Sequence, residues 1–411
     1  MQKMTMTRWT IGLTTLTLLL FGNCRNNPTG QKPSVTENLQ DTLTQIKAHS
    51  QIPGFAISIV QGDSLIFSQG FGLADIKNNK DYTVETIQPI ASISKTFIGL
   101  ALMKAIEQGH FTLETDINEI LPFRITNPFH PTDTIKIKHL ATHTSGLLDN
   151  DSIFVASYTL KPKPDTDLGT FFKEYFTPSG KLYSSSNFSN YKPGGQFNYS
   201  NIAAALVAYL IEIKTKMTFP EFTSKYIFQP LQMTNTHWFY DSAKADRYSV
   251  LYEITKHSDP EYKILLNSDN SVKPYTDITY PDGKLFSTID DMTKYLQTMI
   301  KGYSGNDSLI STASFQSLFH RQFDKNTLPV DIEESEPNRA IFWAFDSHDN
   351  ITHTGSDYGL TTFILFNPKS KVGHVVFFNT AFDGENNEQA INDARHILST
   401  ISKFETQWTK Q

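Results

Sequence analysis

Segments with strand character lie near both ends of the chain, and this distribution constrains the fold most strongly. Near the N-terminus, residues 55–60 and 64–71 flank the two-residue turn Gly62-Asp63 and predict a β-hairpin. Near the C-terminus, residues 361–366 and 372–378 are rich in β-branched and aromatic side chains and predict two more strands. Strands at both ends, accompanied by terminal helices, favour one sheet domain that both ends of the chain complete.

The segment between these strands is mostly helical and irregular. Apolar periodicity predicts helices over residues 35–49, 93–106, 202–213, 292–300 and 387–404, with a weaker one around 219–228. The stretch 149–195 is dense in Ser, Asn, Pro, Gly and Tyr and is predicted to be a long loop on the rim of a binding cleft.

We therefore predict an α+β fold for a domain that spans residues 35–404. An antiparallel sheet flanked by helices is expected from about 35–90 and 281–404, and a mostly helical second lobe from about 91–280. Small-molecule sites tend to lie between lobes, so we expect the active site there.

Composition describes an ordinary folded protein. The 411 residues are 39% hydrophobic and 19% charged, and the net charge is −6, from 36 basic and 42 acidic residues. Neither this balance nor any basic run gives a reason to expect nucleic acid as a partner.

The N-terminus has the pattern of a targeting segment. Lys3 and Arg8 precede a mostly apolar stretch, and residues 1–23 are predicted to be a signal peptide. Cys24, the only cysteine, follows directly and resembles the lipidation site of bacterial lipoproteins. Residues 24–34 would then be a tether, and the protein would be exported and lipid-anchored in the bacterial cell envelope. The alternative is an ordinary signal peptide with an incidental cysteine, because Phe21-Gly22-Asn23 departs from the usual small residue before a lipidated cysteine.

Ser92-Ile93-Ser94-Lys95 is the first stretch that suggests chemistry. Residues three apart share a helix face, so the hydroxyl of Ser92 and the amine of Lys95 can touch. A serine becomes a nucleophile when a neighbouring base takes its proton, and a neutral lysine in a dry site can be that base.

Two later segments can supply partners. Tyr199-Ser200-Asn201 precedes an apolar helix, so Tyr199 and Asn201 can project into one site, although Ser200 or Asn201 also makes an ordinary N-cap. His353-Thr354-Gly355 opens a strand, where a glycine lets a ligand approach the backbone and a histidine can hold an anion or pass a proton. The alternative for this segment is a surface turn.

In order and setting, the three segments resemble the signature of the serine β-lactamase and penicillin-binding superfamily, in the class C β-lactamase and D-alanyl-D-alanine carboxypeptidase branch. Residues 139–147 resemble that branch's His-Leu-Leu-Thr-His-Thr-Ser-Gly-Leu segment, and 230–233 its Pro-Leu-Gly-Met. Gly283-Lys284-Leu285-Phe286-Ser287-Thr288, with Asp290 and Asp291, resembles its Gly-Gly-Leu-x-Ser-Thr-x-x-Asp. The resemblance covers about residues 52–404 and implies a β-lactamase/transpeptidase-like fold.

The resemblance also implies roles. Ser92 would be the nucleophile, Lys95 and Tyr199 would relay protons, and Asn201 would orient Lys95 and the substrate amide. The N–H groups of Ser92 and Ser356 would form the oxyanion hole. No metal or other cofactor is implied, and the partner is a small-molecule or peptide substrate.

His353 stands where efficient β-lactamases of this branch have lysine, as in D,D-peptidase and esterase members. With Thr354 and Gly355 it would face the substrate's carboxylate or leaving group. We therefore expect hydrolysis of an amide, lactam or ester through an acyl-enzyme, with acyl transfer or a penicillin-binding sensor as the alternatives.

Other motif matches have simpler interpretations. Ser268-Asp269-Asn270 spells a class A β-lactamase motif but lies in a polar turn. His139 and His143 have the spacing of a zinc pair but no further ligand is evident, and Ser145 has no identifiable aspartate partner. Asp290 and Asp291 are expected to charge the start of a helix.

Overall fold

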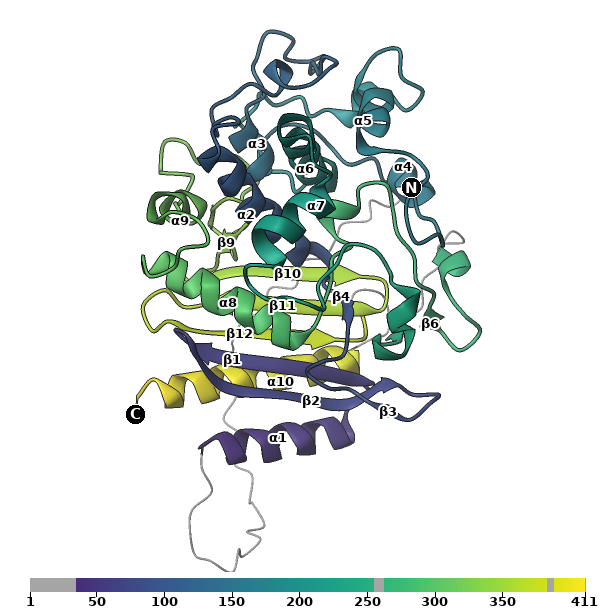
Figure 1. Cartoon of the computed structure of the whole chain (residues 1–411), viewed down its shortest axis with the longest axis vertical. Coiled ribbons are helices and arrows are strands. Elements are labelled where there is room, and N and C mark those ends of the chain that lie inside the picture. The colour runs from purple at the N-terminus through teal and green to yellow at the C-terminus, as the bar shows by residue number, and fades with distance from the viewer. Residues whose placement is uncertain (1–34, 255–261, 383–387, 411) are drawn as a thin grey trace, which may run out of the picture.

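Both ends of the chain meet in one antiparallel sheet. The computed structural model describes residues 35–254, 262–382 and 388–410, so the predicted signal peptide, tether and Cys24 lie outside the described residues (Figure 1). The sheet has eight strands in the order β3-β2-β1-β12-β11-β10-β9-β8. β1 (Gly54–Gln61) pairs with β2 (Ser64–Asp75) across the predicted hairpin and with β12 (Val372–Phe378) on its other side, which joins the two chain ends.

The other strands extend the sheet in both directions. β11 (Leu360–Phe366) and β10 (Ile351–Asp357) follow β12, and the short β9 (Ala344–Phe345) and β8 (Asn338–Arg339) complete that edge. The two-residue β3 (Lys80–Asp81) lies at the opposite edge. The α+β prediction is confirmed, and β3, β8 and β9 are additions that the sequence analysis did not include.

Helices cover both faces of the sheet. Phe55, Ile57 and Ile59 of β1 share one buried cluster with apolar residues of α1 (Val35–His49) and α10 (Glu388–Trp408), which pack against each other (Figure 1). Ala56 and Val60 point to the other face, where α8 (Ile289–Tyr303) lies on β1 and β12. Burial on both faces explains why residues 55–60 are a nearly continuous apolar run.

The remaining helices gather beyond that second face, at the top of Figure 1. α2 (Ser94–Glu107) packs against α6 (Asn201–Thr215), and both are apolar around most of their surface because they are buried on nearly all sides. Shorter helices surround this pair: α3 (Ile137–Ala141), α7 (Phe219–Thr223) and α9 (Thr312–Leu318). α9 contacts α2, so a segment from the C-terminal half also completes this layer.

Two predictions about local structure were incomplete. Residues 149–195 contain α4 (Asp151–Ala156) and α5 (Leu168–Phe176) rather than one long loop. α5 buries Phe171, Phe172 and Tyr175, which are spaced for one helix face but flanked by Ser, Pro and Gly that favour turns. The weaker helix around 219–228 is α7 followed by a π-helical turn, Ser224–Phe228.

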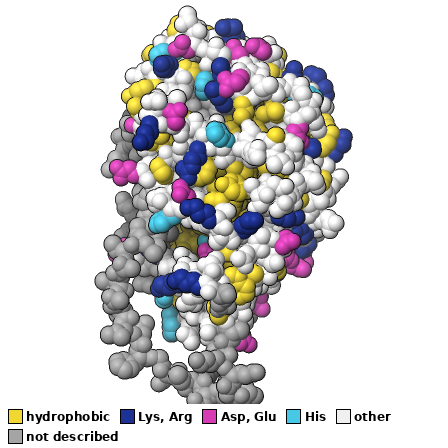
Figure 2. Space-filling view, turned by 90° about the vertical axis from the view of Figure 1, so that its left-hand side faces the viewer, with side chains coloured by type: hydrophobic (Ala, Val, Ile, Leu, Met, Phe, Trp, Pro, Cys, Tyr) yellow, Lys and Arg dark blue, Asp and Glu magenta, His cyan; other side chains and the backbone are white. Residues whose placement is uncertain are grey.

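The described surface carries charges of both signs. On the face shown in Figure 2, Lys and Arg side chains are interspersed with Asp and Glu, so no single basic field covers it. Among the described residues, no helix is both long enough and apolar enough to cross a membrane.

Candidate active site

Ser92 lies in a 3-10 turn, Ala91–Ile93, directly before α2 rather than inside that helix. Ala91 has φ of 45°, in the left-handed region that residues other than glycine rarely adopt. Two contacts fix this turn: Ser94 Oγ donates to the Ala91 carbonyl oxygen at 2.6 Å and accepts from the Leu285 N–H at 3.2 Å. The turn therefore presents the Ser92 hydroxyl at the boundary between the sheet and the helices.

Lys95 is fully buried and its amine contacts the Ser92 hydroxyl. Nζ donates to Ser92 Oγ at 3.2 Å and to the Asp282 carbonyl oxygen at 2.7 Å. The Oδ1 atom of Asp282 lies 3.8 Å from Nζ, and the centre of the Tyr199 ring lies 5.0 Å from it. A buried amine beside a serine is the arrangement that base-activated nucleophilic catalysis requires.

The segment Tyr199-Ser200-Asn201 combines a helix N-cap with a position beside Lys95. Ser200 is the N-cap of α6, where its Oγ accepts from the Ala203 N–H at 3.0 Å. Because the cap fixes the backbone at the start of α6, it also places Tyr199 over Lys95. The cap and the site interpretations are therefore compatible.

The carboxylate of Asp149 holds the Tyr199-Ser200-Asn201 segment in place through hydrogen bonds. The sequence analysis did not single out Asp149. Its carboxylate accepts from Ser200 Oγ at 2.9 Å, from the Asn201 N–H at 2.8 Å and from the Ile202 N–H at 3.0 Å. Burial raises the pKa of Asp149, although these three hydrogen bonds favour the charged form. A buried carboxylate at a helix N-terminus also faces the positive end of the helix dipole.

His143 supports the same segment from the other side. Its Nδ1 accepts from the Ser200 N–H at 3.1 Å, and its ring stacks on Tyr199 with 4.3 Å between ring centres. His139 instead accepts from the Lys136 N–H through Nδ1, and burial lowers the pKa of His139 to about 4. The two histidines therefore accept hydrogen bonds from different backbone N–H groups. Among the described residues, no group of three metal-binding side chains occurs.

β10 brings the third segment against the nucleophile. A Cβ at Gly355 would overlap Thr362 Oγ1 and would lie 2.5 Å from the Ile90 carbonyl oxygen, so glycine is needed for this approach. Thr362 Oγ1 also donates to that carbonyl at 2.9 Å. The backbone of Ser356, next along β10, is thereby placed beside the turn that carries Ser92.

His353 and Thr354 precede Gly355 on β10. The His353 ring centre lies 6.5 Å from that of Tyr199, and His353 Nδ1 lies 2.7 Å from the Thr354 carbonyl oxygen. A carbonyl oxygen only accepts, so this contact places a hydrogen on Nδ1 and leaves Nε2 as an acceptor in neutral imidazole. The structure thus brings all three predicted segments to one place.

One predicted contact is replaced by another. Within the described part of the chain, Lys95 makes no hydrogen bond to Asn201, which was expected to orient it. Asp282 contacts the amine instead. The sequence analysis did not single out Asp282, which directly precedes the segment 283–291 that resembles the family.

Lys284 forms a second buried ion cluster behind β10. Its Nζ lies 2.6 Å from Asp357 Oδ2, 3.4 Å from Asp277 Oδ2 and 3.8 Å from the centre of the Tyr275 ring. The Tyr275 hydroxyl donates to the same Asp357 carboxylate. Despite desolvation, these carboxylates raise the pKa of Lys284, so it stays charged and fixes the end of β10.

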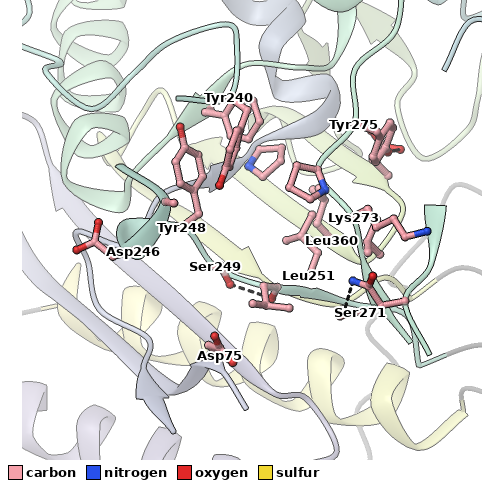
Figure 3. Close-up of a pocket in the computed structure, with 18 of the residues that line it drawn as sticks. Asp75, Tyr240, Asp246, Tyr248, Ser249, Leu251, Ser271, Lys273, Tyr275 and Leu360 are labelled. Atoms are coloured by element: carbon pink, nitrogen blue, oxygen red, sulfur yellow. Dashed lines mark hydrogen bonds between the residues drawn. The ribbon is translucent and has the colours of Figure 1, made fainter. Parts of the chain in front are cut away.

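A cavity of about 500 Å³ lies next to this cluster. Figure 3 shows Tyr240 and Tyr248 together on one side of it, with Leu251 and Leu360 on another. None of the residues of the three candidate catalytic segments, 92–95, 199–201 and 353–356, lines it. The cavity therefore borders the site but is separate from the groups that would react.

An antiparallel sheet beside a helical layer, with a serine, a buried lysine and a tyrosine at their junction, defines a serine hydrolase. The chain belongs to the β-lactamase family, because the family profile described as "Beta-lactamase" matches residues 39–398. The sequence analysis predicted membership in the serine β-lactamase and penicillin-binding superfamily and a β-lactamase/transpeptidase-like fold, and both predictions are confirmed.

Curated relatives and solved structures agree with this assignment. The chain is 24% identical to "Protein flp" of Staphylococcus aureus, over 92% of this chain and 71% of that protein. It is 25% identical to a "Beta-lactamase" of Yersinia enterocolitica, over 88% of this chain and 90% of the relative.

Two solved structures share the fold. One is a β-lactamase/D-alanine carboxypeptidase from Yersinia pestis, with a TM-score of 0.66 and 16% identity over 90% of this chain and 98% of that one. The other is an octameric penicillin-binding protein homologue from Pyrococcus abyssi, with a TM-score of 0.64 and 20% identity over 89% and 77%.

Proposed function

We propose that the protein hydrolyses an amide, lactam or ester through an acyl-enzyme on Ser92, with the preferences of a D,D-carboxypeptidase or esterase. One observation carries the proposal: the buried Lys95 amine lies 3.2 Å from Ser92 Oγ, within reach of the proton it must take. The likeness of the fold to that of a β-lactamase/D-alanine carboxypeptidase supports it.

The first half-reaction forms the acyl-enzyme. Ser92 Oγ bonds to the carbonyl carbon as its proton moves to the neutral amine of Lys95. Backbone N–H groups of Ser92 and Ser356 receive the oxyanion, and such donors contribute about 3 kcal/mol each. Tyr199, which lies over Lys95, passes the proton to the leaving group. Water then bonds to the acyl carbon as its proton moves to Tyr199, the C–Oγ bond breaks, and a proton returns through Tyr199 and Lys95 to Ser92 Oγ, which releases the carboxylic acid and restores the free enzyme.

His353 supports a preference for substrates that need no cation at the third motif. An ordinary histidine has a pKa of about 6.5 and is mostly neutral at pH 7, whereas lysine is always charged there. In neutral form, with its hydrogen on Nδ1, His353 offers a substrate carboxylate only an acceptor. We therefore propose weak turnover of β-lactams and better turnover of esters or D-amino-acid peptides.

A fluorophosphonate probe followed by peptide mapping tests the nucleophile. The adduct is expected on the peptide that contains Ser92, and Ser92→Ala should abolish it. Ser145→Ala is the matched control, because Ser145 is also buried but its Oγ accepts from the backbone N–H of Leu147. An adduct on Ser94 or Ser145 would contradict the assignment.

Turnover of nitrocefin, a D-Ala-D-Ala peptide and p-nitrophenyl esters tests the reaction type. We expect the esters or the peptide to be the better substrates. Labelling at Ser92 without turnover would instead indicate a penicillin-binding sensor, and product formation only with an added amine would indicate an acyltransferase. Fast nitrocefin hydrolysis at pH 8, comparable with the best ester, would contradict the proposed preference.

A further inference from the structure

A buried carboxyl group lies beside the catalytic amine. Asp282 contacts Lys95 twice, through its carbonyl oxygen at 2.7 Å and through Oδ1 at 3.8 Å, and both side chains are almost completely buried. We propose that Asp282 is a positioning residue that holds the Lys95 amine against Ser92 and sets the pH at which this amine takes the Ser92 proton. The inference rests on the proposed function.

Backbone pairing fixes Asp282 in this place. It ends the 3-10 turn Tyr280–Asp282, and four residues later β7 (Phe286–Ser287) pairs with β4 (Gln88–Pro89), just before the nucleophile turn. The Ile90 N–H donates to the Leu285 carbonyl oxygen at 2.9 Å between these points. The Asp282 segment and the Ser92 turn therefore form one unit, which fixes the backbone of Asp282 beside Lys95.

The environment of Asp282 does not favour a permanent negative charge. Its Oδ2 is buried and has no hydrogen-bond partner among the described residues. A buried carboxylate oxygen without a donor loses its hydration without replacement. Burial raises the pKa of Asp282 to about 7, although Lys95 acts in the opposite direction. The carboxyl group can therefore change its charge near neutral pH.

Several titratable groups surround Asp282 and Lys95, and their charges affect whether Asp282 is ionised. Two cations lie among four carboxyl groups and two phenols: Lys95, Lys284, Asp149, Asp277, Asp282, Asp357, Tyr199 and Tyr275. They come from α2, the segment before α4, the residues before α6, the loop around the 3-10 turn and the end of β10. If all were ionised except the phenols, two negative charges would remain uncompensated. Lys284 already has Asp357 and Asp277 as close partners, so the only ion pair within 4 Å of the Asp282 carboxylate among the described residues is the one with Lys95.

The proton balance gives the direction of the effect. In the reactive state Lys95 is a neutral amine, and it becomes an ammonium as the Ser92 proton reaches Nζ and Oγ bonds to the carbonyl carbon. An ionised Asp282 stabilises that ammonium before substrate arrives, so a higher pH is needed to obtain the neutral amine. A neutral group at position 282 removes this attraction, and the neutral amine then exists at lower pH.

The test compares pH profiles of kcat/KM for ester hydrolysis by the full chain. In Asp282→Asn the acidic limb should move to lower pH by about one unit or more, as expected for losing a charge 3.8 Å from the amine. Asp282→Glu retains the charge and should lie closer to wild type. Asp277→Asn is the matched control, because it neutralises a buried carboxyl on the same segment whose close partner is Lys284, and its limb should move less than that of Asp282→Asn.

The outcomes separate this inference from the proposed function. If wild type forms no adduct at Ser92, the proposed function fails. If wild type forms the adduct but the acidic limb of a folded Asp282→Asn does not move, Asp282 has only a structural role and the inference is refuted. Should the Asn variant not fold, Asp282→Ser, a smaller neutral substitution, is expected to shift the limb in the same direction, and an unchanged limb there refutes it equally.

Discussion

Replacing Asp149 with asparagine should loosen the start of α6 and with it the Tyr199-Ser200-Asn201 segment. Oδ1 of Asp149 accepts from Ser200 Oγ and the Ile202 N–H, and Oδ2 accepts from the Asn201 N–H. An asparagine keeps one oxygen and turns the other into an NH₂ group. If the remaining oxygen keeps its two donors, the NH₂ group faces the Asn201 N–H, donor against donor.

The expected loss of stability follows from these contacts. A hydrogen bond to a charged group contributes about 1.5–3 kcal/mol, and a buried donor left without a partner costs about 1–3 kcal/mol. The neutral amide is cheaper to bury than a carboxylate, which offsets part of this cost. We therefore expect Asp149→Asn to lower the free energy of unfolding by about 2–4 kcal/mol.

The pH dependence has a defined sign. Burial raises the pKa of Asp149 in the folded state, so its contribution to stability is largest below the unfolded pKa of about 3.9 and falls as pH rises through the folded pKa. The difference between wild type and Asp149→Asn should therefore shrink as pH rises.

Urea unfolding followed by circular dichroism measures the loss, and kcat on an ester reports the displacement of Tyr199. Asp167→Asn is the matched control: Asp167 caps α5 through the Thr170 N–H and hydroxyl, but it is exposed and no motif residue depends on it. For Asp167→Asn we expect the free energy of unfolding to fall by about 1 kcal/mol or less and kcat to stay unchanged. Equal losses in the two variants, or a normal kcat in Asp149→Asn, would refute the reasoning.

Four further outcomes are expected. Burial raises the pKa of Glu212 to about 7, so its stabilising contribution declines as pH rises from about 4.5 through 7, and Glu212→Gln should raise the melting temperature at pH 8 but not at pH 4. Gly355→Ala should abolish activity through overlap with the nucleophile turn, whereas Gly283→Ala, whose new Cβ would meet nothing nearer than 3.9 Å, should fold normally. His353→Lys should raise kcat/KM for carboxylate-bearing β-lactams relative to neutral esters by about tenfold or more, which parallel assays measure. Cys24→Ser should release the protein from the membrane fraction; release of wild type as well would favour plain secretion.

Local patterns in the chain were sufficient for much of the fold. The period of the apolar residues located α1, α6 and α10, and the Gly62-Asp63 turn located the β1–β2 hairpin, because each depends on neighbours within a few positions. The spacing of Ser92 and Lys95 was visible in the same way, since residues one turn apart need no distant residue to face the same way. Tyr199 and His353 were joined to them only through the resemblance to the family.

Contacts between distant segments depend on tertiary packing and could not be inferred in this way. The residue that holds Lys95 is Asp282, 187 positions away, and Asp149 reaches the start of α6 from 52 positions upstream of Asn201. Neither carboxyl stands out among the 42 acidic residues of the chain. Their importance comes from burial beside an amine or a helix N-terminus, which changes the cost of carrying charge and exists only after the sheet and the helices have packed together.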